Sequence, residues 1–168
     1  MCKICFDTTV FQNYKKHRKL LENFFRHINS KNFAYQGESH KIHEEFHQKL
    51  TFVNENNISL ELFLQIKEKY SNLHDGEICL ITFALENNCC FISDDDNARR
   101  KAKGENIHPC CINNENVEVG GSIGILIFLR DIAKIISKKE AKRIYEEMQK
   151  HNWLPNMDID KISLEECV

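Results

Sequence analysis

The sequence of 168 residues contains little of what builds linkers, fibres or membrane spans. Only two prolines and six glycines occur, which argues against collagen-like architecture and Pro-rich linkers. The longest apolar stretch, residues 123–129, is far shorter than the roughly 20 residues that a membrane-spanning helix requires. The N-terminus has no apolar region resembling a secretory signal, so we expect a cytoplasmic protein with no membrane contact.

The chain also lacks an excess of charge of either sign. It has 23 basic and 25 acidic side chains, with a formal net charge of −2, so net charge confers no general affinity for polyanions. The apolar fraction of 42% supplies enough volume for a core and excludes wholesale disorder. We therefore predict one compact domain over residues 1–153, followed by a C-terminal tail over residues 154–168.

The eight cysteines need an explanation. Without a secretory context their even number does not indicate disulfides, so we expect free thiols that fill apolar space. Cys2 and Cys5 have the spacing of half a zinc site. However, residues three apart on a strand point to opposite faces, and the sequence contains no second pair of this spacing. A structural zinc site is therefore disfavoured.

Short apolar runs alternate with segments of helical periodicity. Strands are predicted at residues 3–6, 33–35 and 89–92, and helices at 10–29 (one helix or a pair), 42–52, 60–70, 76–87, 97–103, 123–136 and 138–151. Residues 107–119 show no clear period and are expected to be irregular. Buried strands that alternate with helices predict an α/β domain with a small, mostly parallel sheet flanked by helices.

Carboxylates follow the first and the last of these strands. Asp7 ends the first strand, and Asp94 and Asp95 follow the last one. Glu77 lies in the first turn of the apolar helix that leads into the last strand. Ligands of open α/β sheets bind at the carboxyl ends of the strands, so we expect these acids to meet at one edge.

Clustered carboxylates repel one another unless a cation lies between them. Mg²⁺ and Mn²⁺ prefer oxygen ligands, and a cation held in this way can activate water for attack on a phosphodiester. The hydroxyls of Thr8 and Ser93 adjoin the acids and can orient them. Helix capping is the alternative role for Asp94 and Asp95, and for Glu77 the alternative is interaction with the helix dipole.

Several segments together resemble the PIN-domain nucleases. These are residues 4–10 with Asp7 and Thr8, Gly76-Glu77, residues 94–99, residues 121–126, and a closing helix over residues 137–153. The resemblance covers residues 1–12 and 73–153 and is thin over residues 30–72. It implies a PIN-like fold and a metal-dependent endoribonuclease that uses Mg²⁺ or Mn²⁺. It further implies a toxin-type ribonuclease with a cognate antitoxin, and a homodimer.

The resemblance also implies roles for individual acids. Asp7 matches the first acid of the family, Glu77 the third, and Asp95 with its neighbour Asp94 the fourth. The second acid is an early helical glutamate, which Glu45 matches, with Glu44 and Glu38 as alternatives. We therefore assign catalysis to Asp7, Glu45, Glu77, Asp94 and Asp95, and metal binding to Asp7, Glu77 and Asp95.

Basic side chains adjoin the acids in two clusters. Lys15, Lys16, Arg18 and Lys19 follow the first strand, and Arg99, Arg100, Lys101 and Lys103 follow the aspartate run. Cations beside a carboxylate site can hold the phosphates of a substrate while the site acts on one of them. We expect Lys15, Lys16, Arg99 and Arg100 to bind RNA, although solvated helix faces would have the same composition.

Two alternative functions remain open. The string from His43 to His47 satisfies the His-Glu-x-x-His pattern of zinc hydrolases, and His40 lies nearby. The sequence offers no obvious third zinc ligand close to this string. The other alternative is a catalytically inactive module of the same fold that binds RNA or protein, in which the carboxylates act only as caps.

Overall fold

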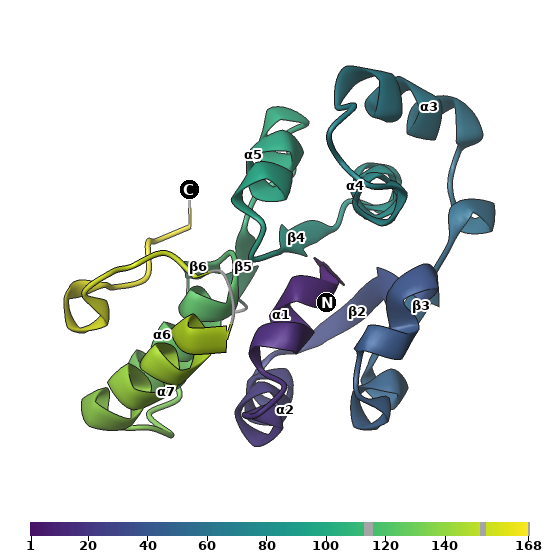
Figure 1. Cartoon of the computed structure of the whole chain (residues 1–168). Helices are drawn as coiled ribbons and strands as arrows, with labels where there is room; N and C mark the ends of the chain where they lie inside the picture. Colours follow the sequence, from purple (N-terminus) through teal and green to yellow (C-terminus); the bar gives the residue numbers. More distant parts are fainter. Residues whose placement is uncertain (113–115, 152–153, 168) are drawn as a thin grey trace.

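The chain folds around a four-stranded parallel sheet (Figure 1), and the computed structural model describes residues 1–112, 116–151 and 154–167. The strand order is β3-β2-β1-β4, and every neighbouring pair is parallel. The strands are β1 (Cys2–Phe6), β2 (Ser30–Tyr35), β3 (Thr51–Val53) and β4 (Cys90–Ile92). The predicted α/β class with a small parallel sheet is confirmed.

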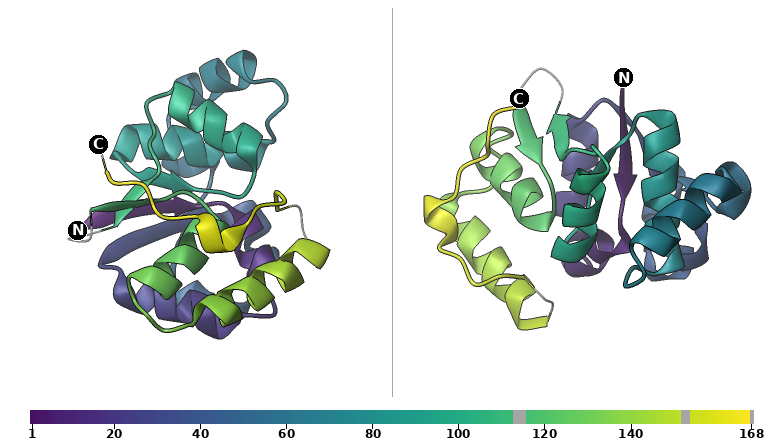
Figure 2. Two further views of the ribbon diagram at one scale, coloured as in Figure 1. Left: turned by 90° about the vertical axis from the view of Figure 1, so that its left-hand side faces the viewer. Right: turned by 90° about the horizontal axis from the view of Figure 1, so that it is seen from above.

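Helices cover both faces of the sheet, so the molecule has three layers (Figure 2). One face carries helices from both ends of the chain, and the other carries helices from its middle. The first layer holds α1 (Thr8–Asn13), α2 (Arg18–His27), α6 (Ser122–Asp131) and α7 (Lys138–His151), and the second holds α3 (Leu60–Lys69), α4 (Asp75–Asn87) and α5 (Asp96–Gly104). These helices also form crossover connections, which parallel strands require.

The central strand β1 is buried on both faces. Ile4, Cys5 and Phe6 have no exposed surface. Ile4 and Phe6 belong to the core under α1, α2, α6 and α7, whereas Cys5 belongs to the core under α3, α4 and α5. Cys2 packs against the first of these cores. Cys2 and Cys5 therefore face opposite sides of the sheet, as predicted, and do not form half of a zinc site.

The carboxyl ends of three strands lie at one edge of the sheet. Phe6 of β1 pairs with Ile92 of β4, and Cys5 pairs with Phe33 of β2. Because the strands are parallel, the residues that follow β1, β2 and β4 emerge side by side. This register brings the predicted acids together.

Residues 42–52 do not form the predicted α-helix. They contain the whole of the 3₁₀ helix η2 (Glu44–Lys49) and the start of β3, and they follow another 3₁₀ helix, η1 (Gln36–Lys41). Phe46 and Leu50 are buried, as their spacing predicts. However, the next three residues, 51–53, are β-branched or aromatic, and they pair with β2 as a strand. Tertiary pairing thus ends the helical segment early. A third short 3₁₀ helix, η3 (Glu55–Asn57), leads towards α3.

The region between α5 and α6 is more ordered than expected. It contains β5 (Cys110–Ile112) and β6 (Val117–Val119), which pair antiparallel as a separate two-stranded sheet. The prediction of an irregular segment was wrong here, because three-residue strands are too short to show a period. The following helix, α6, ends at Asp131 instead of residue 136, since Lys134 adopts the left-handed conformation.

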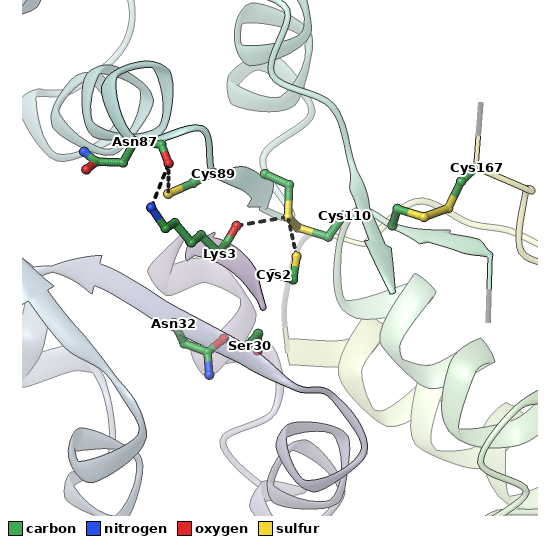
Figure 3. The surroundings of a disulfide bond; sticks show 10 residues. Cys2, Lys3, Ser30, Asn32, Asn87, Cys89, Cys110 and Cys167 are labelled. Carbon is green, nitrogen blue, oxygen red and sulfur yellow. Dashed lines mark hydrogen bonds between the residues drawn. A yellow bond between two sulfur atoms is a disulfide. The ribbon is translucent and has the colours of Figure 1, made fainter. Parts of the chain in front are cut away.

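Two disulfides contradict the expectation that the thiols are free. They join Cys90 to Cys110 and Cys111 to Cys167, so adjacent residues of β5 are linked to β4 and to the C-terminal segment. Figure 3 shows the surroundings of the first bond. Cys2, Cys5, Cys79 and Cys89 are free thiols, as predicted.

The segment after residue 153 packs against the rest of the chain. It contains the 3₁₀ helix η5 (Ile159–Lys161), and the side chain of Ile159 is buried. The Arg130 guanidinium donates hydrogen bonds to the carbonyls of Ile159 and Ile162, both at 2.8 Å. Trp153, the last residue of the predicted domain and closing helix, lies outside the described residues. Among the helices that are described, none combines the length and apolar character needed to cross a membrane.

Candidate active site

Asp7 lies at the centre of the sheet edge. Its backbone N–H extends the ladder by donating to the Ile92 carbonyl at 2.9 Å, and its side chain is buried. Two hydroxyl groups donate to the same carboxylate oxygen, Oδ2, from Ser93 at 2.6 Å and from Thr9 at 3.0 Å. Burial raises the pKa of Asp7, and these hydroxyl bonds counteract part of that effect.

The two hydroxyls connect Asp7 to the backbone of the aspartate run. The N–H of Asp94 donates to Thr9 Oγ1 and the N–H of Asp95 donates to Ser93 Oγ, both at 3.0 Å. Each hydroxyl therefore accepts from an amide and donates to Asp7. Such a chain orients the carboxylate. The predicted supporting role of Ser93 has this geometry, whereas Thr9, not Thr8, provides the second hydroxyl.

Glu77 reaches the same edge from the first turn of α4. Its Oε2 accepts from the backbone N–H of His74 at 3.0 Å, and the residue is buried. Burial, together with the charge of Asp7 and a hydrogen bond with the Asp95 side chain, raises the pKa of Glu77 to about 7. Carboxyl groups this close repel one another when both are charged, which favours either the protonated form or a cation between them.

Asp95 has two roles at once. Its Oδ1 accepts from the N–H groups of Asn97 at 2.9 Å and Ala98 at 3.2 Å, so it caps α5. Its carboxyl group also contacts Glu77. The capping alternative is therefore correct for Asp95, and the cap is what orients this side chain towards the other acids.

Asp94 is held by the N-terminus of α6. Its Oδ1 accepts from the N–H of Ser122 at 2.6 Å, and its Oδ2 accepts from the Ser122 hydroxyl and from Asn13 Nδ2 at 2.5 Å. A Cβ atom on Gly121 would lie 2.7 Å from Asp94 Oδ1, so only glycine permits this approach. Asp94 thus anchors the loop before α6, and its oxygens are largely engaged by the protein.

Glu38, not Glu45, lies beside Asp7. Glu38 follows β2 in η1, accepts from the Thr8 hydroxyl at 2.9 Å, and pairs with Lys41 at 3.0 Å. Burial opposes its ionisation, but the bonds from Lys41 and Thr8 lower the pKa of Glu38 overall. Its charge in turn contributes to the raised pKa of Asp7.

Glu45 makes its described contacts elsewhere, with Arg18 at 3.8 Å and with the His43 ring at 3.9 Å. Glu44 is exposed. Glu38, which was an alternative to Glu45 for the second acid, is therefore the glutamate that lies in the acidic cluster. The sequence signal was available, since Glu38 is three residues beyond a predicted strand that ends at the same edge.

A groove of about 900 Å³ lies beside the acids. Its lining includes Thr9, Asn13, the aspartate run 94–96, Arg99, and a wall formed by His151 and residues 154–156. A second hollow of about 260 Å³ shares Asn13 and His151 with it and continues to Lys15, Lys16 and His17. The two hollows together form a path from the acids to a basic surface.

The predicted basic residues divide between these surfaces. Arg99 Nη1 donates to the Ser93 carbonyl at 2.8 Å, and Asp96 pairs with Arg99 at 3.3 Å and with Arg100 at 3.2 Å. Lys16 Nζ lies 3.4 Å from the ring of His151. Arg99 therefore supports the aspartate run directly, whereas Lys15 and Lys16 lie further along the path.

The donor chemistry of the cluster suits a hard divalent cation. Asp7, Glu77 and Asp95 offer only oxygen atoms, and the raised pKa of Glu77 marks a position where positive charge is favourable. Across residues 1–112, 116–151 and 154–167, no three His, Cys, Asp or Glu side chains stand at the spacing of a closed metal site. The donors thus fit a cation in kind, whereas their spacing in the described residues is not that of a closed metal site.

The histidine string does not form a zinc pair. His43 precedes η2, and its ring accepts from the N–H of Glu45, while His47 Nε2 contacts the carbonyls of Ser39 and Ile42. A 3₁₀ helix has three residues per turn, so residues four apart do not share its face. The geometry argues against a zinc hydrolase.

Comparison with known proteins gives one match. A family model described as a PIN domain matches residues 6–162, which is nearly the whole chain and includes the weakly matched region 30–72. No curated protein and no solved structure matches significantly.

Proposed function

This chain belongs to the PIN-domain family, and we propose that it is a metal-dependent endoribonuclease that hydrolyses RNA phosphodiester bonds at the acidic cluster. The convergence of Asp7, Glu77 and Asp95 carries the proposal. Asp7 follows β1, Glu77 lies in the first turn of α4, and Asp95 follows β4, up to 88 positions apart in the chain. The Glu77 carboxyl interacts with both of the others. A fold gains no stability from placing buried carboxylates together, which favours a functional reason.

Asp7, Glu77 and Asp95 would hold Mg²⁺ or Mn²⁺, which activates water and offsets charge on the phosphodiester when it is bound. The remaining residues position these acids. Ser93 and Thr9 fix the carboxylate of Asp7 through hydroxyls that accept from the backbone. Glu38 adds a fourth carboxylate beside Asp7, held in place by Thr8 and Lys41.

The groove of about 900 Å³ supports a polynucleotide substrate. Arg99 lies in it beside the acids, and Lys15, Lys16 and His151 line the hollow that continues from it. This arrangement offers cations to phosphates on one side of the bond that is cut. Arg100 lies beyond Asp96 in a third hollow of about 220 Å³ and would contact a strand that leaves the groove on that side.

The test is cleavage of a fluorescent single-stranded RNA in Mn²⁺, in Mg²⁺ and in EDTA. Wild type is expected to cleave with either cation and not in EDTA, and Asp95→Asn is expected to lose activity. The matched control is Asp96→Asn, because Asp96 adjoins Asp95 but is largely exposed. Cleavage that survives both EDTA and Asp95→Asn would refute the mechanism. A protein that binds RNA without cleaving it, and that no divalent cation stabilises, would be an inactive binding module instead.

Narrower proposals rest on the family resemblance. They are a toxin role with a cognate antitoxin, a homodimer and a cytoplasmic location. Growth arrest on induction, with rescue by a co-expressed neighbouring reading frame, tests the toxin role. Light scattering of the purified chain tests the dimer. An unaffected culture and a monomeric mass would remove these two proposals without affecting the nuclease assay.

A further inference from the structure

The Cys90–Cys110 disulfide lies between two parts of the molecule that the site depends on. Cys90 is the first residue of β4, and the aspartate run follows that strand directly. Cys110 is the first residue of β5, which forms the two-stranded sheet with β6. Figure 3 shows Cys110 beside β4, with Cys2 and the Lys3 carbonyl directed towards the bond.

Few backbone interactions accompany this covalent link. β5 and β6 are not part of the four-stranded sheet, of which β4 is an edge strand. A long hydrogen bond of 3.4 Å runs from the Phe91 N–H to the His108 carbonyl, and one of 2.9 Å runs from the Ser93 N–H to the Gly120 carbonyl. Ile112 and Val119 also pack in the core that contains Ile92, and the disulfide is the covalent bond that joins β5 to β4.

The two-stranded sheet carries the loop that holds Asp94. β6 ends at Val119, and the next three residues contact the aspartate run. The Gly120 carbonyl accepts from the Ser93 N–H. Gly121 lies so close to Asp94 that a Cβ atom at this position would clash with its carboxylate. The N–H and the hydroxyl of Ser122 donate to the two carboxylate oxygens of Asp94. If the sheet of β5 and β6 moved, this loop would move with it and shift Asp94 and Ser93. Ser93 in turn orients Asp7.

We propose that the Cys90–Cys110 pair is a reversible oxidation site that controls the geometry of the acidic cluster. The closed disulfide holds β5 and β6 against β4 and fixes Ser122 on Asp94. The open dithiol releases that constraint and weakens the site. The proposal rests on the proposed nuclease function only for its effect on catalysis. Its structural part stands without that function.

The reductant is a cellular thiol of the glutathione or thioredoxin class. Its thiolate attacks Cys90 Sγ, because Cys90 is partly exposed whereas Cys110 is fully buried. The Cys90–Cys110 bond breaks, a mixed disulfide forms on Cys90, and Cys110 leaves as a thiolate that takes up a proton. A second reductant thiol then releases Cys90. In total the pair gains two electrons and two protons, and the reductant becomes a disulfide.

Cys2 lies next to this bond but does not replace it. Its Sγ is 3.9 Å from Cys90 Sγ. Ile4, not Cys2, is the register partner of Cys90, so the two backbones lie too far apart for a direct disulfide without movement of the N-terminus. Burial also raises the pKa of Cys2, which keeps it a thiol at neutral pH. The exchange therefore needs an external thiol.

The Cys111–Cys167 disulfide serves as an internal control. It joins β5 to the C-terminal segment, which already pairs with β6 through the Glu118 N–H to Glu165 carbonyl bond at 2.8 Å. It does not join β5 to β4. The Cys111→Ser/Cys167→Ser variant removes this bond and keeps the other, so the two effects can be separated.

Amide hydrogen exchange of the metal-free chain tests the structural part. On reduction, or in Cys90→Ala/Cys110→Ala, the Ser93 and Ser122 amides are expected to exchange at least about tenfold faster. The β1 amides of Ile4 and Cys5 should change much less. Cys79→Ala, which alters a buried free thiol, and Cys111→Ser/Cys167→Ser should leave Ser93 and Ser122 protected. Equal acceleration of all these amides, or none, would overturn the proposal.

Two further measurements complete the test. Alkylation in glutathione buffers of increasing reduced fraction should open Cys90–Cys110 while the chain stays folded, and a bond that stays closed in excess reduced glutathione contradicts the proposal. The turnover number for RNA is expected to fall about tenfold on reduction in wild type, and the double alanine variant should stay at the lower value in both states. If no state cleaves RNA, the proposed function fails, while exchange and alkylation still decide the redox site.

Discussion

The hydroxyl of Ser93 donates a 2.6 Å hydrogen bond to the carboxylate of Asp7, 86 positions away in the chain. This bond joins the ends of the adjacent strands β1 and β4 at the edge where the acids gather. It also connects Asp7 to the backbone of the aspartate run, because Ser93 Oγ accepts from the Asp95 N–H. The position of Asp7 therefore depends on residues that the sequence places far from it.

Ser93→Ala should reduce RNA cleavage by about 10–100-fold, the usual cost of losing a group that orients a metal ligand. Thr9→Val should have a similar effect, since Thr9 donates to the same oxygen of Asp7. Thr51→Val is the matched control, because Thr51 is exposed at the start of the edge strand β3, at the opposite end of the strand from the acids. Initial rates at saturating Mn²⁺ measure these effects. Equal rates for the Thr51 and Thr9 variants would argue against the hydroxyl network.

Gly121→Ala should disrupt the site, and Gly120→Ala should not. A Cβ atom on Gly121 would lie 2.7 Å from Asp94 Oδ1 and 2.9 Å from the Ser93 carbonyl, whereas on Gly120 its nearest neighbour is 3.7 Å away. The clash should cost about 1–3 kcal/mol of unfolding free energy. Urea unfolding and RNA cleavage measure both effects. A stable, active Gly121→Ala protein would show that the close approach to Asp94 is unimportant.

In the absence of divalent cations the fold should become less stable as the pH rises from about 4.5 to above 7. Glu77 has a pKa of about 7 when folded, above its ordinary value of 4.5, so the folded state binds more protons in this range. Its contribution is present below pH 4.5 and is lost as the pH passes 7, at most about 3 kcal/mol. Urea unfolding against pH should be flatter in Glu77→Gln. A steeper profile in this variant would contradict the assignment.

Arg130→Leu should loosen the first part of the C-terminal segment, which forms a wall of the groove, while the Cys111–Cys167 disulfide still holds its end. Arg130 is buried and donates to the carbonyls of Ile159 and Ile162, so its removal leaves these acceptors unpaired at a cost of about 1–3 kcal/mol. Limited proteolysis should then cut after residue 153 sooner than in wild type. The control is Arg143→Leu, since Arg143 is exposed on α7. Identical cleavage of the two variants would exclude this role.

Lys16→Gln should weaken RNA binding uniformly across sequences. Lys16 contacts His151 in the hollow that extends the groove, so its loss removes a cation without disturbing the acids. The slope of log affinity against log salt should fall by about 1. Fluorescence anisotropy with an Asp95→Asn background avoids cleavage during the measurement. Lys139→Gln, on an exposed part of α7, should leave the slope unchanged, and a similar loss in both variants would point to non-specific attraction.

Much of the site was predictable because parallel strands impose a simple rule. Residues that follow the strands meet at one edge, so the sequence alone predicts that Asp7 and the aspartate run lie together. The same rule applied to β2 would have favoured Glu38 over Glu45. Instead the apolar spacing of Phe46 and Leu50 suggested a helix that would present Glu45. Both residues are buried, but Phe46 lies in a 3₁₀ helix and Leu50 lies between that helix and β3.

Other features depended on contacts that no local pattern encodes. The strands β5 and β6 have three residues each, too few for a period, and pairing among eight cysteines has many solutions. The sequence assigns Asp94 to catalysis together with Asp95, yet the oxygens of Asp94 accept from Ser122 and Asn13, which lie 28 and 81 positions away. Only the folded chain distinguishes an acid that anchors a loop from one that faces the cluster.

Calorimetric titration with Mn²⁺ tests most directly whether Asp7, Glu77 and Asp95 form a cation site. Wild type should bind Mn²⁺, Asp95→Asn and Glu77→Gln should bind it much more weakly, and Asp96→Asn and Glu45→Gln should match wild type. Binding that persists unchanged in Asp95→Asn and Glu77→Gln, or no binding by wild type, would contradict the account.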